Sequence, residues 1–212
     1  MKNLQKLYQE AGEFHGSICG GIILGVRMAC LGCRMIGLDE PKNPENRKKL
    51  MVWVEISRCA TDGIQSVTGC SLGRRTLKVK DYGIMAATFL NLESRKAFRI
   101  SIHPDSRQKA KALFPHLTDK NHVYLEAYKL MSDKDLFTVE EVYVNTEDED
   151  MPGPPPTRTK CQICGEEVIA GREIKQEGKI LCRRCAHMPL YYSPVRKVNL
   201  PEFENIPQDL QS

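Results

Sequence analysis

The order of hydrophobic and polar residues predicts helices at the start of the chain. Between residues 3 and 14, apolar side chains recur at the spacing of one helical face, as in a short amphipathic helix. From Gly20 to about Leu38 nearly every side chain is apolar, so we expect a second helix that lies largely buried. The prolines at positions 41 and 44 end this helix, because proline cannot continue one.

Strand-like patterns begin at residue 51. Residues 51–57 predict a buried strand, and residues 60–68 predict a short helix that Gly69 ends in the left-handed conformation. A hairpin is expected between residues 84–92 and 96–102. The remaining expected elements are a strand at 76–80, helices at 105–114 and from 119 to about 131, and a final strand at 137–144.

An acidic and proline-rich stretch separates two parts of the chain. Residues 146–150 read Thr-Glu-Asp-Glu-Asp, and four prolines stand between positions 152 and 156. Such a run stays solvated, and its prolines keep it extended. The predicted organisation is a core domain over 1–145, a linker over 146–159, a zinc-binding module over 160–190 and a tail over 191–212.

Two Cys-x2-Cys pairs give the module the strongest local signal in the sequence. Cys161 and Cys164 are followed, after seventeen residues, by Cys182 and Cys185, which is a spacing typical of structural zinc sites. A rubredoxin-like iron site is the competing interpretation. A module over residues 160–190 is too small to bury a sufficient apolar core. The metal is therefore expected to supply the folding energy. Four thiolates fill the coordination sphere of the metal, which leaves no open position for catalysis. Within the module, a small hairpin between 167–170 and 179–181 is predicted.

Basic side chains in and around this module raise the question of nucleic-acid binding. Aromatic side chains for base stacking are sparse and come late, at Tyr191, Tyr192 and Phe203, which argues against it. The basic residues concerned are Arg158, Lys160, Arg172, Arg183, Arg184, Arg196 and Lys197.

Composition narrows the class of protein. The chain has 212 residues, of which 41% are hydrophobic and 27% charged, as in a soluble globular protein. A formal net charge of +4 does not by itself demand a nucleic-acid partner. Nine cysteines without a secretory signal predict cytosolic thiols, some of them on metal, and hence a cytoplasmic protein. No apolar run reaches the roughly 18 residues of a membrane span, so no membrane association is expected.

A second set of candidate ligands lies in the core domain. His15 and Cys19 stand four residues apart at the entrance to the apolar helix, with Gly20 and Gly21 directly after the thiol. A soft metal prefers thiolate with imidazole, and free backbone N–H groups at a helix start stabilise a thiolate. The site is therefore a metal or reactive-thiol site, or else a surface histidine beside a buried cysteine.

Cys59 is expected at the end of one strand and the start of one helix, a place where a thiolate is also stabilised. Asp62, in the first turn of that helix, either complements the helix dipole or handles a proton. Cys59 and Asp62 are the catalytic candidates. Arg74 is a candidate anion contact, although an arginine pair in a loop is more often solvated.

Cys30 and Cys33 form a further Cys-x2-Cys pair inside the apolar helix. Eleven residues separate Cys19 from Cys30, which is about 16 Å along an α-helix, so the two cannot share one ion. We interpret Cys30 and Cys33 as core thiols, with a redox pair as the alternative.

An ordered series of motifs resembles the family of the formylmethanofuran dehydrogenase E-subunit. The series runs through His15-Gly16-x-x-Cys19-x-Gly21, Gly25-x-Arg27, Cys59-x-x-Asp62-Gly63-Ile64-Gln65-x-x-Thr68-Gly69-Cys70-x-x-Gly73 and Asp81-Tyr82-Gly83. The resemblance covers nearly the whole chain to about residue 190. This chain has Ser17 where the family usually has a second histidine, and Gly20 where it has proline.

The resemblance implies an α+β core domain of mixed helices and a mainly antiparallel sheet, followed by a treble-clef-like zinc module. It implies a cleft in which His15, Cys19, Cys59 and Cys70 meet and hold zinc or another thiophilic ion. It also implies a homodimer.

Three functional hypotheses follow. The first is metal-assisted or redox-linked chemistry on a small molecule at the cleft. The second is a non-enzymatic accessory, metal-delivery or regulatory role, in which the zinc module docks a partner protein. The third is a nucleic-acid-binding regulator. An open coordination position favours the first hypothesis.

Overall fold

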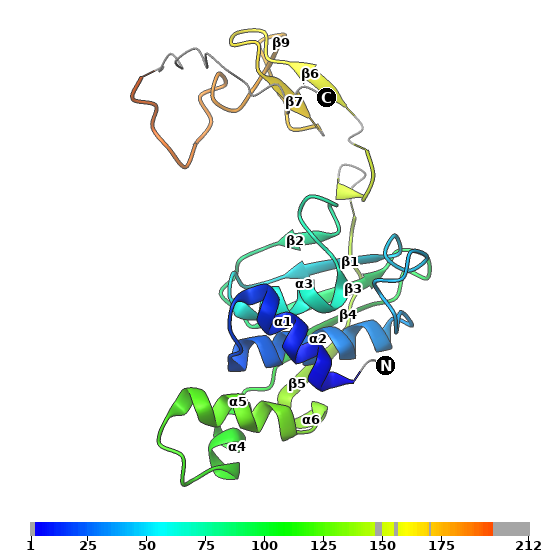
Figure 1. The fold of residues 1–212 in the computed structure, drawn as a ribbon. Coiled ribbons are helices and arrows are strands. Elements are labelled where there is room, and N and C mark those ends of the chain that lie inside the picture. The colour runs from blue at the N-terminus through cyan, green and yellow to red at the C-terminus, as the bar shows by residue number, and fades with distance from the viewer. Residues whose placement is uncertain (1–2, 147–149, 155–156, 170, 197–212) are drawn as a thin grey trace, which may run out of the picture. The chain divides into compact units, whose positions relative to one another are not determined.

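A long buried helix on one face of a five-stranded sheet organises the larger part of the molecule (Figure 1). The computed structural model describes residues 3–146, 150–154, 157–169 and 171–196. The chain divides into two compact units between Pro154 and Pro155. We refer to them as the large domain and the small module. Parts of the predicted linker and most of the predicted tail, at 147–149, 155–156 and 197–212, lie outside the described residues.

The sheet of the large domain has the strand order β2-β1-β3-β4-β5. Strands β1 and β2 run parallel, whereas the other neighbouring pairs are antiparallel. The prediction of an α+β fold with a mainly antiparallel sheet is therefore confirmed. The strands are β1 (Leu50–Val54), β2 (Leu77–Val79), β3 (Ala86–Asn91), β4 (Ala97–Ile102) and β5 (Phe137–Glu141).

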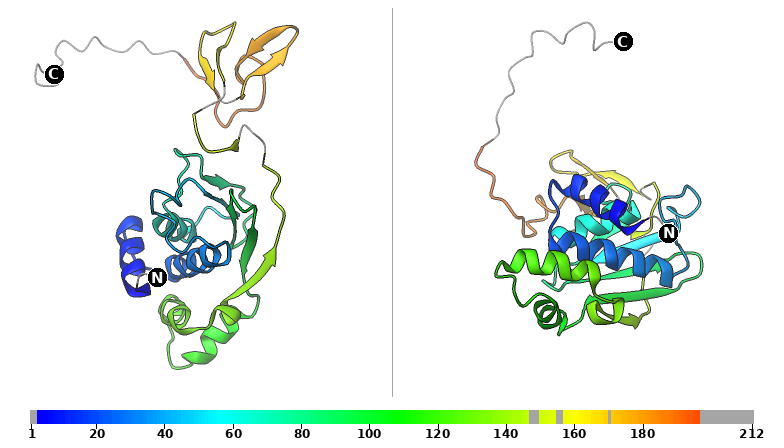
Figure 2. Two further views of the ribbon diagram at one scale, coloured as in Figure 1. Left: turned by 90° about the vertical axis from the view of Figure 1, so that its right-hand side faces the viewer. Right: turned by 60° about the horizontal axis from the view of Figure 1, so that its bottom comes forward.

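The helices of this domain lie mostly on one side of the sheet. The turned view shows α1 separated from the sheet by α2 and α3 (Figure 2, left). Helix α6 is a single turn, too short for a periodic pattern to predict. The helices are α1 (Leu4–His15), α2 (Gly20–Met35), α3 (Cys59–Thr68), α4 (Ser106–Leu113), α5 (Lys120–Leu130) and α6 (Asp133–Leu136).

Helix α2 is the centre of the core because apolar side chains cover most of its circumference. Ile22, Ile23 and Val26 are fully buried, and burial of such side chains contributes roughly 1.5–3 kcal/mol each. At Gly32 a Cβ atom would overlap the ring of Phe89 on β3, so the missing side chain lets the helix lie close to the sheet.

Two arginines on α2 have partners in the last helices. Arg27, which is nearly buried, donates to the carbonyl oxygen of Tyr128 at 2.9 Å and to Asp133 at 2.5 Å. Arg34 donates to the other carboxylate oxygen of Asp133 at 3.2 Å. These bonds tie α2 to the end of α5 and to α6.

From Val142 to Thr146 the chain continues along the sheet after β5 without regular structure. The backbone N–H of Val142 donates to the carbonyl of Ala97 at 3.0 Å, and Arg95 donates to the carbonyl of Val144 at 3.1 Å. Further on, Lys78 on β2 pairs with Asp150 at 3.3 Å. We call residues 142–150 the strap, of which 147–149 lie outside the described residues.

The small module contains two short hairpins. Strand β6 (Arg158–Lys160) pairs with β7 (Glu167–Ile169), and β8 (Ile174–Gln176) pairs with β9 (Lys179–Leu181). The predicted hairpin between 167–170 and 179–181 is therefore wrong, because each of these segments pairs with a different strand. Residue 170, at the end of the first segment, lies outside the described residues.

The chain of the small module reverses at two turns. Cys161 donates its N–H to the carbonyl of Glu166 at 2.9 Å, so the first cysteine pair is itself the turn that folds β7 back on β6. Glu177 and Gly178 both have positive φ, of 52° and 75°, as a tight two-residue hairpin turn between β8 and β9 requires.

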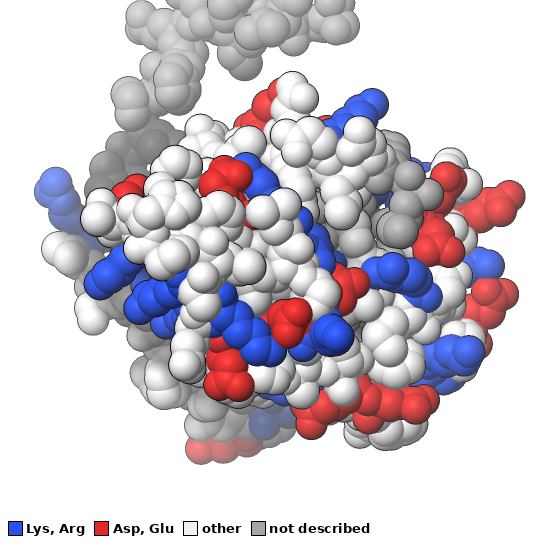
Figure 3. All heavy atoms as spheres, turned by 90° about the horizontal axis from the view of Figure 1, so that it is seen from below, with Lys and Arg blue, Asp and Glu red and all other residues white. Residues whose placement is uncertain are grey.

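Charges of both signs are distributed over the face of the large domain that carries α4, α5 and α6. Figure 3 shows basic and acidic side chains interspersed there. Such a surface does not produce the single-sign field that would attract a polyanion. Within the described residues, no helix is both long and apolar enough to span a membrane.

Candidate metal centres

Three helix ends bring the first group of ligands together. His15 is the last residue of α1, Cys19 is the N-cap of α2, and Cys59 is the first residue of α3. One ligand atom from each of the three side chains lies within 4.8 Å of the others. All three side chains are partly exposed, so the group is open to solvent.

Glycines on α2 and α3 allow this approach. A Cβ atom at Gly25 would overlap the carbonyl oxygen of Ala60, and one at Gly63 would lie 2.8 Å from the carbonyl oxygen of Ile22. At Gly21 a Cβ atom would lie 3.0 Å from the Cβ of Cys59. The two helix backbones are therefore in direct contact, and this contact sets Cys59 beside Cys19.

Asp62 orients the imidazole of His15. The Nδ1 atom of His15 lies 2.7 Å from Oδ2 of Asp62. A carboxylate in this place fixes the tautomer with the proton on Nδ1, which leaves Nε2 free to bind a metal ion. Asp62 also stands in the first turn of α3, where it complements the helix dipole.

The surroundings of Cys59 make its thiol harder to ionise. Burial raises the pKa of Cys59, and the hydrogen bond and negative charge of Cys19 raise this pKa further. Two thiolates so close together repel each other, whereas a divalent cation between them favours loss of both protons.

The donor set fits a thiophilic ion. Two sulfurs and one imidazole nitrogen are ligands of the kind that zinc takes. Two sulfurs bound to one zinc ion lie about 3.8 Å apart, so ligands within 4.8 Å need only a small side-chain movement. Three protein ligands leave a fourth position for water or a small molecule.

Cys70 does not join the group, contrary to what the resemblance implies. It follows α3 at its far end, and the ten residues of that helix span about 15 Å. Its buried Sγ lies 3.9 Å from the carbonyl oxygen of Leu50. After Gly69, whose φ is 68°, the chain comes back towards the start of α3 only beyond β2, where the N–H of Tyr82 donates to the carbonyl of Glu55 at 3.0 Å.

The other candidates also lie apart from this group. Arg74 is exposed and lines a shallow surface hollow with Cys70, Glu10 and Glu13, at the far end of α3. Lys42 also lines this hollow, so its two carboxylates balance two basic side chains and no excess of positive charge favours an anion there. Cys30 and Cys33 lie in the last turns of α2, far along the helix from Cys19.

The second group is the four-cysteine cluster of the small module. One ligand atom from each of Cys161, Cys164, Cys182 and Cys185 lies within 4.8 Å of the others. The sulfurs of Cys164 and Cys182 are 3.7 Å apart, as in a tetrahedral zinc site.

Backbone N–H groups and neighbouring thiols shift the acidity of this cluster in opposite directions. The N–H groups of Cys164 and Cys182 lower the pKa of Cys161 to about 6. Burial, followed by hydrogen bonds from the other thiols, raises the pKa of Cys185 to about 12. Four sulfurs in one place therefore need a cation to become thiolates together, and this cluster can bind a metal such as zinc.

The fold and the first group define a class of protein: an α+β domain in which helix ends present thiols and an imidazole to one open site. The chain belongs to the family described as FmdE, Molybdenum formylmethanofuran dehydrogenase operon, whose model matches residues 14–151.

Comparison with known proteins gives two further similarities. The chain is 30% identical over 210 residues to a "Probable S-adenosyl-L-methionine-binding protein" of Archaeoglobus fulgidus. That match covers 91% of this chain and 55% of the relative, so the chain spans about half the length of that relative.

A solved structure shares the fold. It is the crystal structure of a tungsten formylmethanofuran dehydrogenase FmdE-like protein from Syntrophus aciditrophicus, with a TM-score of 0.58 and 17% sequence identity. The match covers 86% of this chain and 91% of that one.

Proposed function

We propose that His15, Cys19 and Cys59 hold a thiophilic metal ion, with zinc as the first candidate, and that this ion serves chemistry on a small molecule. The observation that carries the proposal is the convergence of two thiols and an imidazole whose Nδ1 is held by Asp62. A fully buried structural site would use a fourth protein ligand, and Cys70 lies too far away to supply it.

The chain's own residues have distinct roles in this proposal. Cys19 and Cys59 bind as thiolates, and the N-terminal ends of α2 and α3 stabilise their negative charge. Asp62 keeps the ring of His15 in the binding orientation, and its half-exposed carboxylate is the candidate to accept a proton from a bound molecule. A metal ion with an open position supplies Lewis-acid polarisation of a bound water or substrate.

We further propose structural zinc in the small module, as part of a treble-clef-like fold, and a cytoplasmic homodimer. Support for the zinc comes from the four-cysteine cluster and from the small amount of buried apolar surface around it.

A second candidate function is docking of a partner protein through the small module. The favouring observation is a set of exposed apolar side chains in that module: Ile163, Ile169, Met188, Tyr191, Tyr192 and Val195. Exposed aromatic and large apolar residues are enriched at protein interfaces. Co-purification with a defined partner tests this candidate. The double variant Tyr191→Ser with Ile163→Ser is expected to abolish capture of that partner and to leave the zinc content unchanged.

Metal analysis tests the main proposal. The parent protein is expected to hold about two ions per chain, and Cys19→Ser with Cys59→Ser about one. Cys182→Ser is also expected to hold about one, because it removes the other site. Cys30→Ser with Cys33→Ser is the matched control, with two thiols replaced outside both groups, and its metal content stays at the parent value.

A cobalt-substituted sample then tests the open position. Sulfur-to-cobalt absorption bands are expected in the Cys182→Ser variant, and added azide is expected to change its d–d bands. A parent protein with one ion, unchanged by Cys19→Ser with Cys59→Ser, overturns the proposal. Cobalt bands that do not respond to azide overturn its catalytic part.

A further inference from the structure

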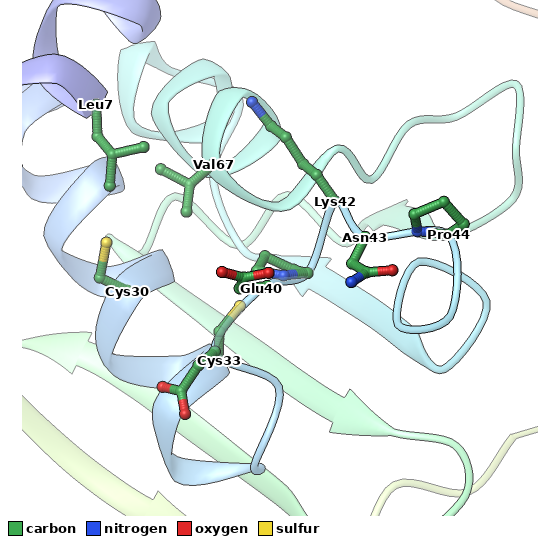
Figure 4. Close-up of a pocket in the computed structure, with 10 residues that line it drawn as sticks. Leu7, Cys30, Cys33, Glu40, Lys42, Asn43, Pro44 and Val67 are labelled. Atoms are coloured by element: carbon green, nitrogen blue, oxygen red, sulfur yellow. The ribbon is translucent and has the colours of Figure 1, made fainter. Parts of the chain in front are cut away.

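A cavity of about 370 Å³ lies between the first three helices and the loop that follows α2. Leu7 comes from α1, Cys30 and Cys33 from α2, and Val67 from α3. Residues 39–44 form the opposite wall. Figure 4 shows the side chains of Leu7, Val67 and Cys30 grouped on one side, with Glu40, Lys42 and Asn43 from the loop facing them. No lining residue belongs to either metal group.

The inner wall of the cavity is apolar. Leu7, Val67 and Cys33 are almost completely buried. Burial also raises the pKa of Cys30 and of Cys33, so both thiols stay protonated and act as soft apolar groups. Neither belongs to a group of three metal-binding side chains among the described residues. This wall suits an apolar body and not a metal ion.

The mouth of the cavity is acidic. Asp39 and Glu40 are exposed, and within the described residues neither carboxylate makes an ion pair. Lys42, the basic residue of the lining, places its ammonium 3.7 Å from Glu10 and is thereby partly neutralised. The entrance therefore carries an excess of negative charge.

The loop wall is held in place by its own hydrogen bonds. Asn46 donates its side-chain amide to the carbonyl of Glu40 at 3.1 Å, and the N–H of Arg47 donates to the carbonyl of Asn43 at 2.9 Å. Pro41 is buried under this turn. A preformed wall lowers the entropy lost when a ligand binds.

We propose that this cavity binds a small organic cation with an apolar body. The apolar body would contact Leu7, Val67 and the two thiols, and the positive group would lie at the carboxylates of Asp39 and Glu40. The volume is within the 300–1,000 Å³ that is usual for small-molecule sites. The inference is independent of the proposed metal function, since the two sites share no residue.

Three probes with the same apolar body and different charge test the proposal: 4-phenylbutylamine, 4-phenylbutanol and 4-phenylbutanoate. Each is titrated into the full-length protein, and binding is followed through the backbone amide signals. The amine is expected to bind about tenfold more tightly than the carboxylate, with the alcohol between them, since each exposed charge contact changes affinity by a small factor. The largest shifts are expected in residues 39–44.

Variants separate the charge from the apolar body. Asp39→Asn with Glu40→Gln is expected to bring the affinities of amine and carboxylate together, with the alcohol unchanged. Glu45→Gln with Glu141→Gln is the matched control, because it removes two exposed carboxylates outside the cavity and keeps the preference for the amine. Val67→Phe is expected to weaken all three probes by filling the cavity.

The proposal is overturned if the amine binds no better than the carboxylate, or if its advantage survives Asp39→Asn with Glu40→Gln. Changes in the backbone amide signals that are confined to residues away from the cavity also overturn the proposal. The two loop substitutions lie on the surface, so this result does not depend on whether Val67→Phe folds.

Discussion

The four-cysteine cluster and the group of His15, Cys19 and Cys59 use similar ligand atoms on very different supports. In the small module, strands of three residues surround the cysteines, and among the described residues its buried apolar cluster consists of Cys161, Leu181, Cys182 and Ala186. In the large domain, the ligands stand on ends of helices that are buried among many apolar side chains. A metal would hold the first structure together, whereas the second is held by packing and offers a site to a metal.

Loss of one zinc ligand gives the largest expected effect. Zinc contributes about 10–16 kcal/mol to the folding of comparable small modules, so Cys182→Ser is expected to unfold the small module. The large domain is expected to keep its structure. In amide spectra, the signals of residues 157–196 would lose dispersion and those of 3–146 would keep it. Cys30→Ser is the control. If the amide signals of the small module stayed dispersed in the metal-free Cys182→Ser variant, the metal would not be what holds this module together.

A glycine substitution in the large domain disturbs the packing that supports its site, just as the loss of a zinc ligand disturbs the small module. In Gly25→Ala the new Cβ would overlap the carbonyl of Ala60, a backbone atom that cannot turn aside. We expect a loss of about 3 kcal/mol in the free energy of unfolding, at the upper end for overpacking. Denaturant unfolding measures it.

Gly73→Ala is the matched control for this substitution, because a Cβ there meets nothing within 4 Å. Its effect is expected to stay within about 0.5 kcal/mol. Equal stability of the two variants would show that contact between α2 and α3 does not support the site.

The Asp62–His15 pair gives an intermediate effect that is confined to one site. Asp62→Asn is expected to weaken metal binding at His15, Cys19 and Cys59 by about 10–100-fold, because the imidazole loses its orienting carboxylate. Competition with a chromophoric chelator measures the affinity, and the zinc of the small module stays bound. Asp105→Asn, at the start of α4, is the control. Equal metal affinities in the Asp62→Asn and Asp105→Asn variants would show that Asp62 does not support metal binding.

The smallest effect is expected from an ion pair on the surface of the small module. Arg158 and Glu167 lie 2.9 Å apart on β6 and β7, and both are largely exposed. Arg158→Gln should change stability by less than about 1 kcal/mol. In the large domain, Arg99→Gln leaves the nearly buried Glu55 without its partner and should cost about 1–3 kcal/mol. Thermal unfolding of the two variants tests this order.

Patterns confined to neighbouring residues were sufficient to predict most elements of the large domain. The apolar run after Gly20 predicted α2, and Gly69 ends α3 in the left-handed conformation, as expected. The placement of Cys59 at a helix start also followed from the local pattern.

Predictions that needed contacts between distant residues were less successful. The hairpin of the small module was paired wrongly because the cysteine turn at 161–164 folds β7 back on β6, and a strand pattern does not specify a partner. Cys70 was expected in the site because the family motif contains it, although a helix length separates it from Cys59. Glycines spaced four apart, at Gly21 and Gly25, are the signal in the sequence that could have predicted the close packing of α2 on α3.

The strap shows that the large domain extends beyond its last strand. Its bonds go to three neighbouring parts of the sheet. Val142 bonds to Ala97 on β4, Val144 to Arg95 in the β3–β4 turn, and Asp150 to Lys78 on β2. A protein truncated after Glu141 would keep α1–α6 and β1–β5 and still lose these bonds. An expression clone for this domain should therefore end near Pro154, where the first compact unit ends.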